Sequence, residues 1–164
     1  NVSYYIPYKD EILLKNINFV IKKNESLLIM GPSGCGKSSL FRVISGLWST
    51  GNGNIYRPNI KKCMFLPQKP YIPSLPLESN TIKNQILFPN INSNNNGNQF
   101  ISDNDIKTVL KDINLFHLDI NRKDDWNSYL SMGEQQRLSF GRVLISKPDI
   151  LFCDEGTSAL DESN

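Results

Sequence analysis

A glycine-rich run between an apolar stretch and an amphipathic one constrains this chain more than any other feature. The run follows the pattern G-x-x-x-x-G-K-[ST], and its residues are Gly31, Pro32, Ser33, Gly34, Cys35, Gly36, Lys37 and Ser38. Residues 27–30 have the composition of a buried parallel strand. Residues 37–45 place Leu40, Phe41 and Ile44 on one face of a helix. The run is therefore predicted to be the loop of a strand–loop–helix unit.

The glycines of this loop have a chemical meaning, because phosphate binding needs many backbone N–H groups turned toward one small concave surface. Bulky side chains and ordinary φ values would prevent that arrangement. The following helix adds unpaired N–H donors and a positive dipole end of roughly half a charge. Lys37 is expected to reach the β- and γ-phosphates, and the Ser38 hydroxyl to ligate Mg²⁺. We expect bound nucleoside triphosphate here, the alternative being a glycine-rich turn with a chance lysine.

Composition and charge narrow the class of protein. A length of 164 residues, with 39% hydrophobic and 21% charged residues, is typical of one globular domain. No signal peptide is recognised, and no apolar run approaches the ~20 residues that span a bilayer, so we expect any membrane role to come through a partner or another segment. A net charge of +2 without a basic, aromatic-rich stripe gives no sign of nucleic-acid binding. Three scattered cysteines favour a reducing compartment.

Short strands are predicted on both sides of the loop. They are residues 2–5, 17–21, 54–56 and 63–66. Gly46 is expected to end the first helix, and residues 51–53 are expected to form a turn. Tyr4, Tyr5 and Tyr8 are candidates for stacking on a base, but β-rich segments carry tyrosines anyway, and the sequence does not choose among them.

The middle of the chain changes character after residue 69. Prolines at positions 70, 73 and 76 break it, and helical periodicity follows in residues 81–88 and 105–115. These features predict a helical subdomain at about residues 74–145. Within it, residues 90–104 form an asparagine-rich insertion that cannot bury enough apolar surface to order itself.

A second informative stretch begins at residue 131. Ser131 followed three residues later by Glu134 is a capping box, and the helix that it opens is expected to run to about Ser146. Two interpretations stay open. The stretch is either a well-capped helix and nothing more, or the serine hydroxyl, the Gly133 N–H and the helix N-terminus form a second anion site.

A hydrophobic strand predicted at residues 149–153 ends in two adjacent acids, Asp154 and Glu155. Because side chains alternate along a strand, we expect Asp154 to face a magnesium ion and Glu155 to face a water placed for attack. Paired acids at a strand end are often only a solvated turn, but the phosphate loop upstream favours the catalytic interpretation. Gln68, after the strand at 63–66, could reach a metal or the attacking water with its carbonyl oxygen.

In this order, the segments resemble the nucleotide-binding domain of ATP-binding cassette (ABC) transporters. In that family they are the Walker A loop at 31–38, the Q-loop at Gln68, the signature motif at 131–137, the Walker B strand ending at 154–155 and the D-loop at 158–161. The resemblance covers residues 1–164 as one domain, apart from the insertion. It implies an α/β fold with a P-loop NTPase core of mostly parallel sheet, an antiparallel β edge and a helical subdomain.

Finer matches resemble subfamily D, which contains peroxisomal fatty-acyl half-transporters with bacterial and plastid relatives. They are residues 34–42, 46–48, 67–71 and 125–126. The resemblance implies a half-transporter for a lipid, acyl or peptide-like substrate. It also implies membrane association through that transporter, with the nucleotide domain facing the cytosol, in a peroxisomal, plastid or plasma membrane.

The resemblance assigns roles to individual residues, with ATP and Mg²⁺ as cofactors. The residues implied to contact nucleotide are the phosphate loop, Ser39, Ser131, Gly133 and Glu134. Those implied to hold Mg²⁺ are Ser38, Gln68 and Asp154. Those implied in catalysis are Glu155, Gln68 and Lys37. Two such domains would bind head to tail, with Ser131 and Gly133 acting on the partner's nucleotide, and closure would drive a transmembrane domain in the same or a partner chain.

Three features depart from the family pattern. Met132 stands where the signature usually has its first glycine, and Gly156 replaces a usual alanine. The chain is expected to end after the D-loop, before the strand that carries the family's switch histidine. The single histidine, His117, precedes the signature and lies between Phe116 and Leu118, so it is interpreted as a structural residue.

Other functions remain alternatives. A soluble ABC-type ATPase of the chromosome-maintenance or DNA-repair kind carries long coiled-coil arms between Walker A and the signature, whereas residues 39–130 contain no sustained heptads. A translation-factor cassette pair would need a second cassette in the parent chain. A fragment that binds ATP without turnover is the third alternative.

Overall fold

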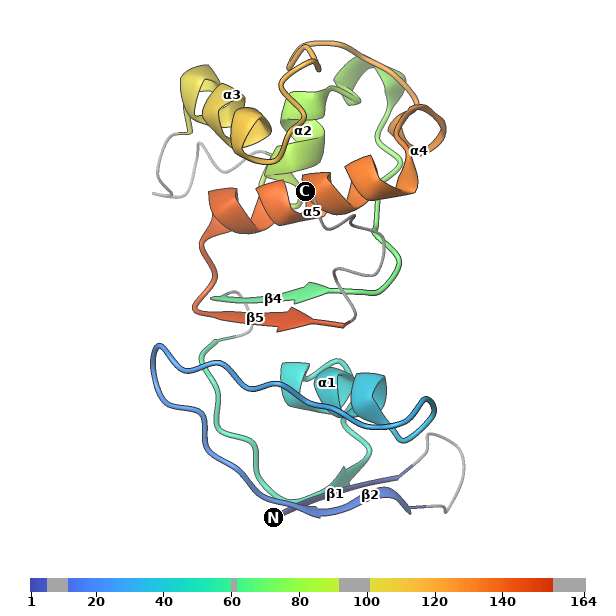
Figure 1. The fold of residues 1–164 in the computed structure, drawn as a ribbon, viewed down its shortest axis with the longest axis vertical. Coiled ribbons are helices and arrows are strands. Elements are labelled where there is room, and N and C mark those ends of the chain that lie inside the picture. The colour runs from blue at the N-terminus through green and yellow to red at the C-terminus, as the bar shows by residue number, and fades with distance from the viewer. Residues whose placement is uncertain (6–11, 60–61, 92–100, 155–164) are drawn as a thin grey trace. The chain divides into compact units, whose positions relative to one another are not determined.

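The computed structural model describes residues 1–5, 12–59, 62–91 and 101–154. It divides into two compact units, Asn1–Phe65 and a second from Leu66 onward. In chain order the elements are β1 (Val2–Tyr5), β2 (Ile12–Ile17), α1 (Lys37–Ser45), β3 (Gly51–Asn52), β4 (Cys63–Leu66), a 3₁₀ turn (Leu77–Ser79), α2 (Ile82–Leu87), α3 (Asp103–Asp112), α4 (Trp126–Tyr129), α5 (Met132–Ser146) and β5 (Ile150–Cys153) (Figure 1). Among the described helices, none combines the length and apolar character that crossing a bilayer requires.

The first unit contains a three-stranded antiparallel sheet in the order β2–β1–β3. Its central strand buries Tyr4, whose side chain is 1% exposed and stacks on Trp48 with ring centroids 5.3 Å apart. The Arg42 guanidinium lies 5.1 Å from the same indole ring. The predicted antiparallel edge is therefore present. Tyr4 already has an aromatic partner, and Tyr8 lies outside the described residues.

The strand predicted at residues 17–21 is wrong in its position. β2 ends at Ile17, which pairs with Val2, the first residue of β1. Residues beyond Ile17 extend past the first residue of the partner strand, so β1 offers them no backbone groups for hydrogen bonding. Alternation of apolar side chains marks a half-buried face, but the length of a strand is fixed by its partner.

Two further strand predictions in this unit are also wrong. Residues 27–30 form no strand, and Leu28 and Met30 are 79% and 80% exposed. A parallel strand needs neighbours to bond its backbone groups, and both edges of β1 are already occupied by β2 and β3. Residues 54–56 form no strand either, because β3 takes the two residues before them and the chain then leaves the sheet at Gly53, whose φ is 112°.

The second unit has a helical core in which α5 packs against α2 and α3. Trp126 of α4 is fully buried in it, and its indole Nε1 donates to the Asn80 carbonyl oxygen at 2.7 Å. The buried residues of this core are Ile72, Ile82, Ile86, Ile106, Leu110, Ile113, Leu115, Leu118, Ile120, Trp126, Leu130 and Leu138. These helices fall within the predicted subdomain at 74–145, except that α5 ends one residue beyond it, at Ser146. Its boundaries remain a prediction, and residues 92–100 of the insertion lie outside the described residues.

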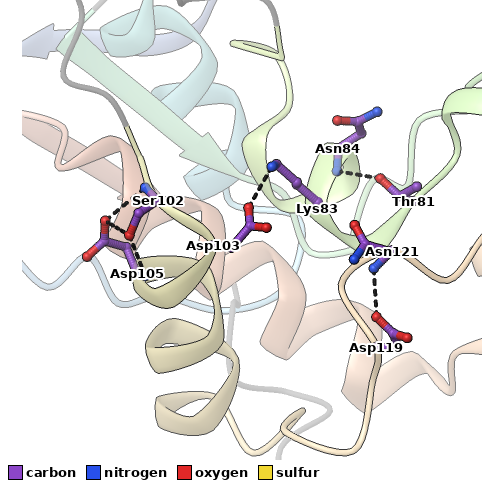
Figure 2. A network of polar contacts seen from close by, with 8 residues as sticks. All are labelled: Thr81, Lys83, Asn84, Ser102, Asp103, Asp105, Asp119 and Asn121. Carbon is purple, nitrogen blue, oxygen red and sulfur yellow. Dashed lines mark hydrogen bonds and ion pairs between the residues drawn. The ribbon is translucent and has the colours of Figure 1, made fainter.

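Local capping explains where these helices begin (Figure 2). The Thr81 hydroxyl accepts from the Asn84 N–H at 3.1 Å and opens α2, as the periodicity predicted. Ser102 and Asp105 form a capping box that starts α3 two residues earlier than predicted. Figure 2 also shows the ion pair between Lys83 and Asp103, 2.6 Å apart, which joins α2 to the first turn of α3.

The strands β4 and β5 form a two-stranded sheet, and their arrows point the same way in Figure 1. The Asp154 N–H donates to the Leu66 carbonyl oxygen at 2.9 Å, at the end of both strands. Both strands match their predicted ranges within one residue. The chain thus combines parallel and antiparallel sheets with helices, as expected for the α/β class.

Candidate functional site

The glycine-rich loop curls around the side chain of its own lysine. Lys37 Nζ donates to the Gly31 and Pro32 carbonyl oxygens at 2.8 and 2.9 Å, and the Cys35 N–H donates to the Pro32 carbonyl oxygen at 3.4 Å. Gly36 has a φ of 98°, which would be strained for a residue with a side chain. This conformation lets the loop pass directly into α1. The loop therefore presents an ammonium group and a turned backbone in one place.

The start of α1 suits an anion. Its N-cap, Gly36, has no side chain to bond the first N–H groups, and its first turn carries no acidic residue. The N–H groups at a helix start have no partner within the helix and carry a partial positive charge, which favours a bound anion. The helix ends at Gly46, as predicted, whose N–H donates to the Val43 carbonyl oxygen at 3.0 Å.

The second unit brings two other candidate residues near each other in the fold. Asp154 is 7% exposed, and its backbone bond to Leu66 places it beside the chain that leads to Gln68. Gln68 itself is exposed. Carboxylate, amide and hydroxyl oxygens are the ligands that Mg²⁺ prefers, so Asp154, Gln68 and Ser38 have suitable chemistry. The magnesium set remains a prediction, and Glu155 lies outside the described residues.

The start of α5 has the capping box that the sequence predicted. Glu134 Oε2 accepts from the Ser131 N–H at 2.9 Å and from its hydroxyl at 2.8 Å, while the Ser131 Oγ accepts from the Glu134 N–H at 3.3 Å. Burial opposes ionisation of Glu134, but these bonds outweigh it, so the pKa of that carboxyl lies below its ordinary value. Gly133 is half-buried, and Met132 is 48% exposed at this helix start.

His117 lies beside this helix start, which the sequence did not indicate. Its Nε2 is 3.4 Å from Glu134 Oε1, and its ring meets Phe116 edge-on. A contact between residues so far apart in the chain leaves no local pattern. Arg142 was missed in the same way. It is a charged residue that is 5% exposed inside α5, and a charge at a core position was the available signal.

Comparison with known proteins points to one family. A family model described as ABC transporter matches residues 14–158. An uncharacterized ABC transporter ATP-binding protein of Synechocystis is 39% identical over all of this chain and 24% of its own length. The human ATP-binding cassette sub-family D member 3 is 34% identical over 92% of this chain and 23% of its own length. The chloroplastic ABC transporter D family member 2 of Arabidopsis thaliana is 32% identical over 96% of this chain and 28% of its own.

Solved structures show the same fold. An inward-facing metal-chelate type ABC transporter is 25% identical, with a TM-score of 0.61, over 99% of this chain and 62% of that one. A bacterial Atm1-family ABC exporter with ATP bound is 23% identical, with a TM-score of 0.73, over 99% of this chain and 29% of that one. The chain spans about a quarter of the length of the curated relatives it matches.

Proposed function

The chain belongs to the ABC transporter family, and from that premise we propose that it binds ATP with Mg²⁺ and hydrolyses it as the motor domain of a transporter. The observation that carries the proposal is the loop at 31–38. In it the Lys37 ammonium donates to the Gly31 and Pro32 carbonyl oxygens, and the loop passes directly into a helix whose N-cap makes no side-chain hydrogen bond. That combination serves the triphosphate of a nucleotide.

In the proposed mechanism each residue has one task. Lys37 leaves its carbonyl partners for the β- and γ-phosphates, which give it stronger, charge-assisted bonds. Ser38, Gln68 and Asp154 would hold Mg²⁺, which would neutralise charge on the phosphates when bound. Glu155 orients the attacking water and accepts its proton. Ser39 completes the contacts of the loop with nucleotide.

We further propose that the site is completed by a second copy bound head to tail. Ser131, Gly133 and Glu134 at the start of α5 would then face the partner's nucleotide. Ser131 and Met132 are exposed at this helix start, which is consistent with such a surface. Closure of the pair would drive a transmembrane domain of the same or a partner chain, and membrane association follows from that attachment.

The subfamily D relatives support a narrower proposal. Their identities of 32–34% and the matching segments favour a half-transporter for a lipid, acyl or peptide-like substrate. The membrane would be peroxisomal, plastid or plasma, with this domain on the cytosolic side. Substrate contacts belong to the membrane domain, so this part of the proposal rests on relationship and not on side chains of this chain.

A titration with ATP and Mg²⁺ tests the proposal, with nucleotide binding and self-association followed together. We expect saturable ATP binding that drives dimer formation, and phosphate release that rises more steeply than linearly with protein concentration, because the complete site needs two copies. Binding without dimer formation or phosphate release would leave an ATP-binding fragment. No binding would contradict the proposed function itself.

A pair of Ser131 variants separates the two interpretations of the capping box. Both Ser131→Ala and Ser131→Gly remove the hydroxyl, but alanine at an N-cap costs about 1 kcal/mol of stability, whereas glycine costs a few tenths. If the hydroxyl binds phosphate, both variants lower ATP turnover alike, although urea unfolding separates their stabilities. If turnover follows stability, with the glycine variant nearly normal, Ser131 is only a helix cap.

A further inference from the structure

An arginine is buried in the core of the second unit, where the proposed mechanism gives it no task. Arg142 of α5 is 5% exposed, and its guanidinium donates to three carbonyl oxygens. Nε bonds the Gln85 backbone oxygen at 2.9 Å, Nη2 bonds Gln85 Oε1 at 3.2 Å, and Nη1 bonds the Tyr71 backbone oxygen at 2.6 Å. Burial lowers the pKa of Arg142 to about 10, so the group still carries its charge at neutral pH.

Gln85 makes a second contact with the chain close to Tyr71. Its side chain is fully buried, and Nε2 donates to the Pro73 carbonyl oxygen and to Asn80 Oδ1, both at 2.8 Å. Arg142 and Gln85 therefore hold the carbonyl groups of Tyr71 and Pro73, on either side of the buried Ile72. We call residues 71–73 the clamped segment.

The clamped segment comes directly after the stretch that carries Gln68. A small cavity lined by Leu66, Pro67, Pro70, Gln136, Ser139 and Phe140 shows that this stretch lies along α5. Its start is fixed by the bond between the Leu66 carbonyl and the Asp154 N–H, and its end by the clamped segment. Gln68 and Lys69 are thus the exposed part of a short bridge whose two ends are anchored.

The other end of α5 carries the signature residues. Ser131 and Arg142 are eleven positions apart, which is about 16 Å along a helix at 1.5 Å per residue. A helix of this length transmits a displacement as a rigid element. Arg142 therefore connects the bridge that carries Gln68 to the helix that presents Ser131.

We propose that Arg142 is a positioning residue for ATP turnover, which ties the clamped segment to α5 so that a displacement at Gln68 reaches Ser131. The inference rests on the proposed function of this site. Stability alone does not account for the side chain, because a buried charge is costly to desolvate and an apolar residue of similar volume fills a core as well. Its distinctive property is that it reaches a loop carbonyl from within a helix.

Amide hydrogen exchange without nucleotide tests the tether. Arg142→Met removes all three donor groups, whereas Arg142→Lys keeps the positive charge and a single donor group. The control is Arg122→Met, because Arg122 is an exposed arginine of the same unit that is bonded to Asp124 and Tyr129. We expect Arg142→Met to raise exchange in residues 68–75 at least about tenfold while the buried part of α3 stays unchanged. Arg142→Lys should restore part of the protection, and Arg122→Met should change nothing there.

Two results would overturn the tether. An equal rise in α3 and in residues 68–75 would mean that Arg142 only holds the core together, and no rise in residues 68–75 would mean that the segment does not depend on it. If Arg142→Met does not fold, Gln85→Met, which removes the bonds to Pro73 and to Arg142 Nη2, and Arg142→Lys are judged by the same two criteria.

The coupling is tested by repeating the exchange with ATP and Mg²⁺ at a protein concentration too low for dimer formation, so that no partner nucleotide contacts residues 131–136. In the unmodified chain we expect protection of residues 31–38 and altered exchange in residues 66–70 and 131–136. In Arg142→Met the responses at residues 31–38 and 66–70 should remain, and the response at residues 131–136 should disappear. We expect kcat to fall by at least about tenfold and KM to stay within about threefold. A retained response at 131–136, or an unchanged kcat, would overturn the role in positioning.

Failure of the proposed function looks different from failure of this inference. If ATP does not protect residues 31–38 in the unmodified chain, the proposed function fails, and the positioning role falls with it. The exchange measured without nucleotide still decides whether Arg142 holds the clamped segment, because that comparison needs no ligand.

Discussion

Replacing Lys37 by alanine is expected to weaken ATP binding by roughly 10²–10⁴-fold, because it removes two charge-assisted hydrogen bonds of about 1.5–3 kcal/mol each. The reason is the position of the ammonium group. Nζ lies in the middle of the loop at 2.8 and 2.9 Å from two of its carbonyl oxygens, where a phosphate bound to the same loop would meet it. Alanine leaves the backbone N–H groups in place but removes the mobile positive charge.

Equilibrium titration with a fluorescent ATP analogue measures this effect directly. Lys83→Ala is the matched control, since Lys83 is a partly exposed lysine paired with Asp103 in the second unit and has no role in the loop. The control should bind as the unmodified chain does. Unchanged affinity in Lys37→Ala would sink the assignment of the phosphate loop, and unfolding curves of both variants exclude a general loss of structure.

Glu155→Gln is expected to keep ATP binding and to reduce turnover by about 10²–10⁴-fold, the usual contribution of a general base. Glutamine matches the size of glutamate and still orients a water by hydrogen bonding, but it does not accept a proton at neutral pH. Glu155 follows Asp154 directly in the sequence, and the Asp154 N–H donates to the carbonyl oxygen of Leu66, the last residue of β4.

Steady-state phosphate release and ATP affinity, measured on the same preparation, check this expectation. ATP-driven dimers should persist in Glu155→Gln, because the nucleotide stays intact in the composite site. Glu78→Gln, at the 3₁₀ turn, is a control with the same chemical change away from the candidate site. Undiminished phosphate release in Glu155→Gln would assign the base to another residue.

Most of the helices followed from local sequence signals, whereas the short helix α4 was not predicted, and the phosphate-binding role of the loop stays a prediction. α1 runs from Lys37 to Ser45 and α5 from Met132 to Ser146, within the ranges predicted from periodicity and capping. These signals act between residues three or four positions apart, so the sequence carries them completely. The start of α3 was predicted two residues late, because Ser102 and its capping box lie within the range assigned to the asparagine-rich insertion at 90–104.

The strands of the first unit were harder to predict because their partners are remote in sequence. An apolar run such as residues 27–30 indicates a preference for burial. It does not indicate which strand, if any, would pair with it. The same reason hid β3, which pairs with β1 about fifty residues earlier in the chain. The contacts of Arg142 with Tyr71 and Gln85 also join distant segments, and only a three-dimensional structure brings them together.

The Ser131 hydroxyl already has an acceptor before any nucleotide arrives, and this affects how the signature would recognise phosphate. Its proton is shared with the Glu134 carboxylate at 2.8 Å. A phosphate oxygen would have to displace one anion to gain the bond, so recognition at this point is a substitution between two negatively charged acceptors. Weak or uncharged ligands would lose that competition. If Ser131 binds phosphate as proposed, its bond to Glu134 would favour a highly charged ligand over a weakly charged one.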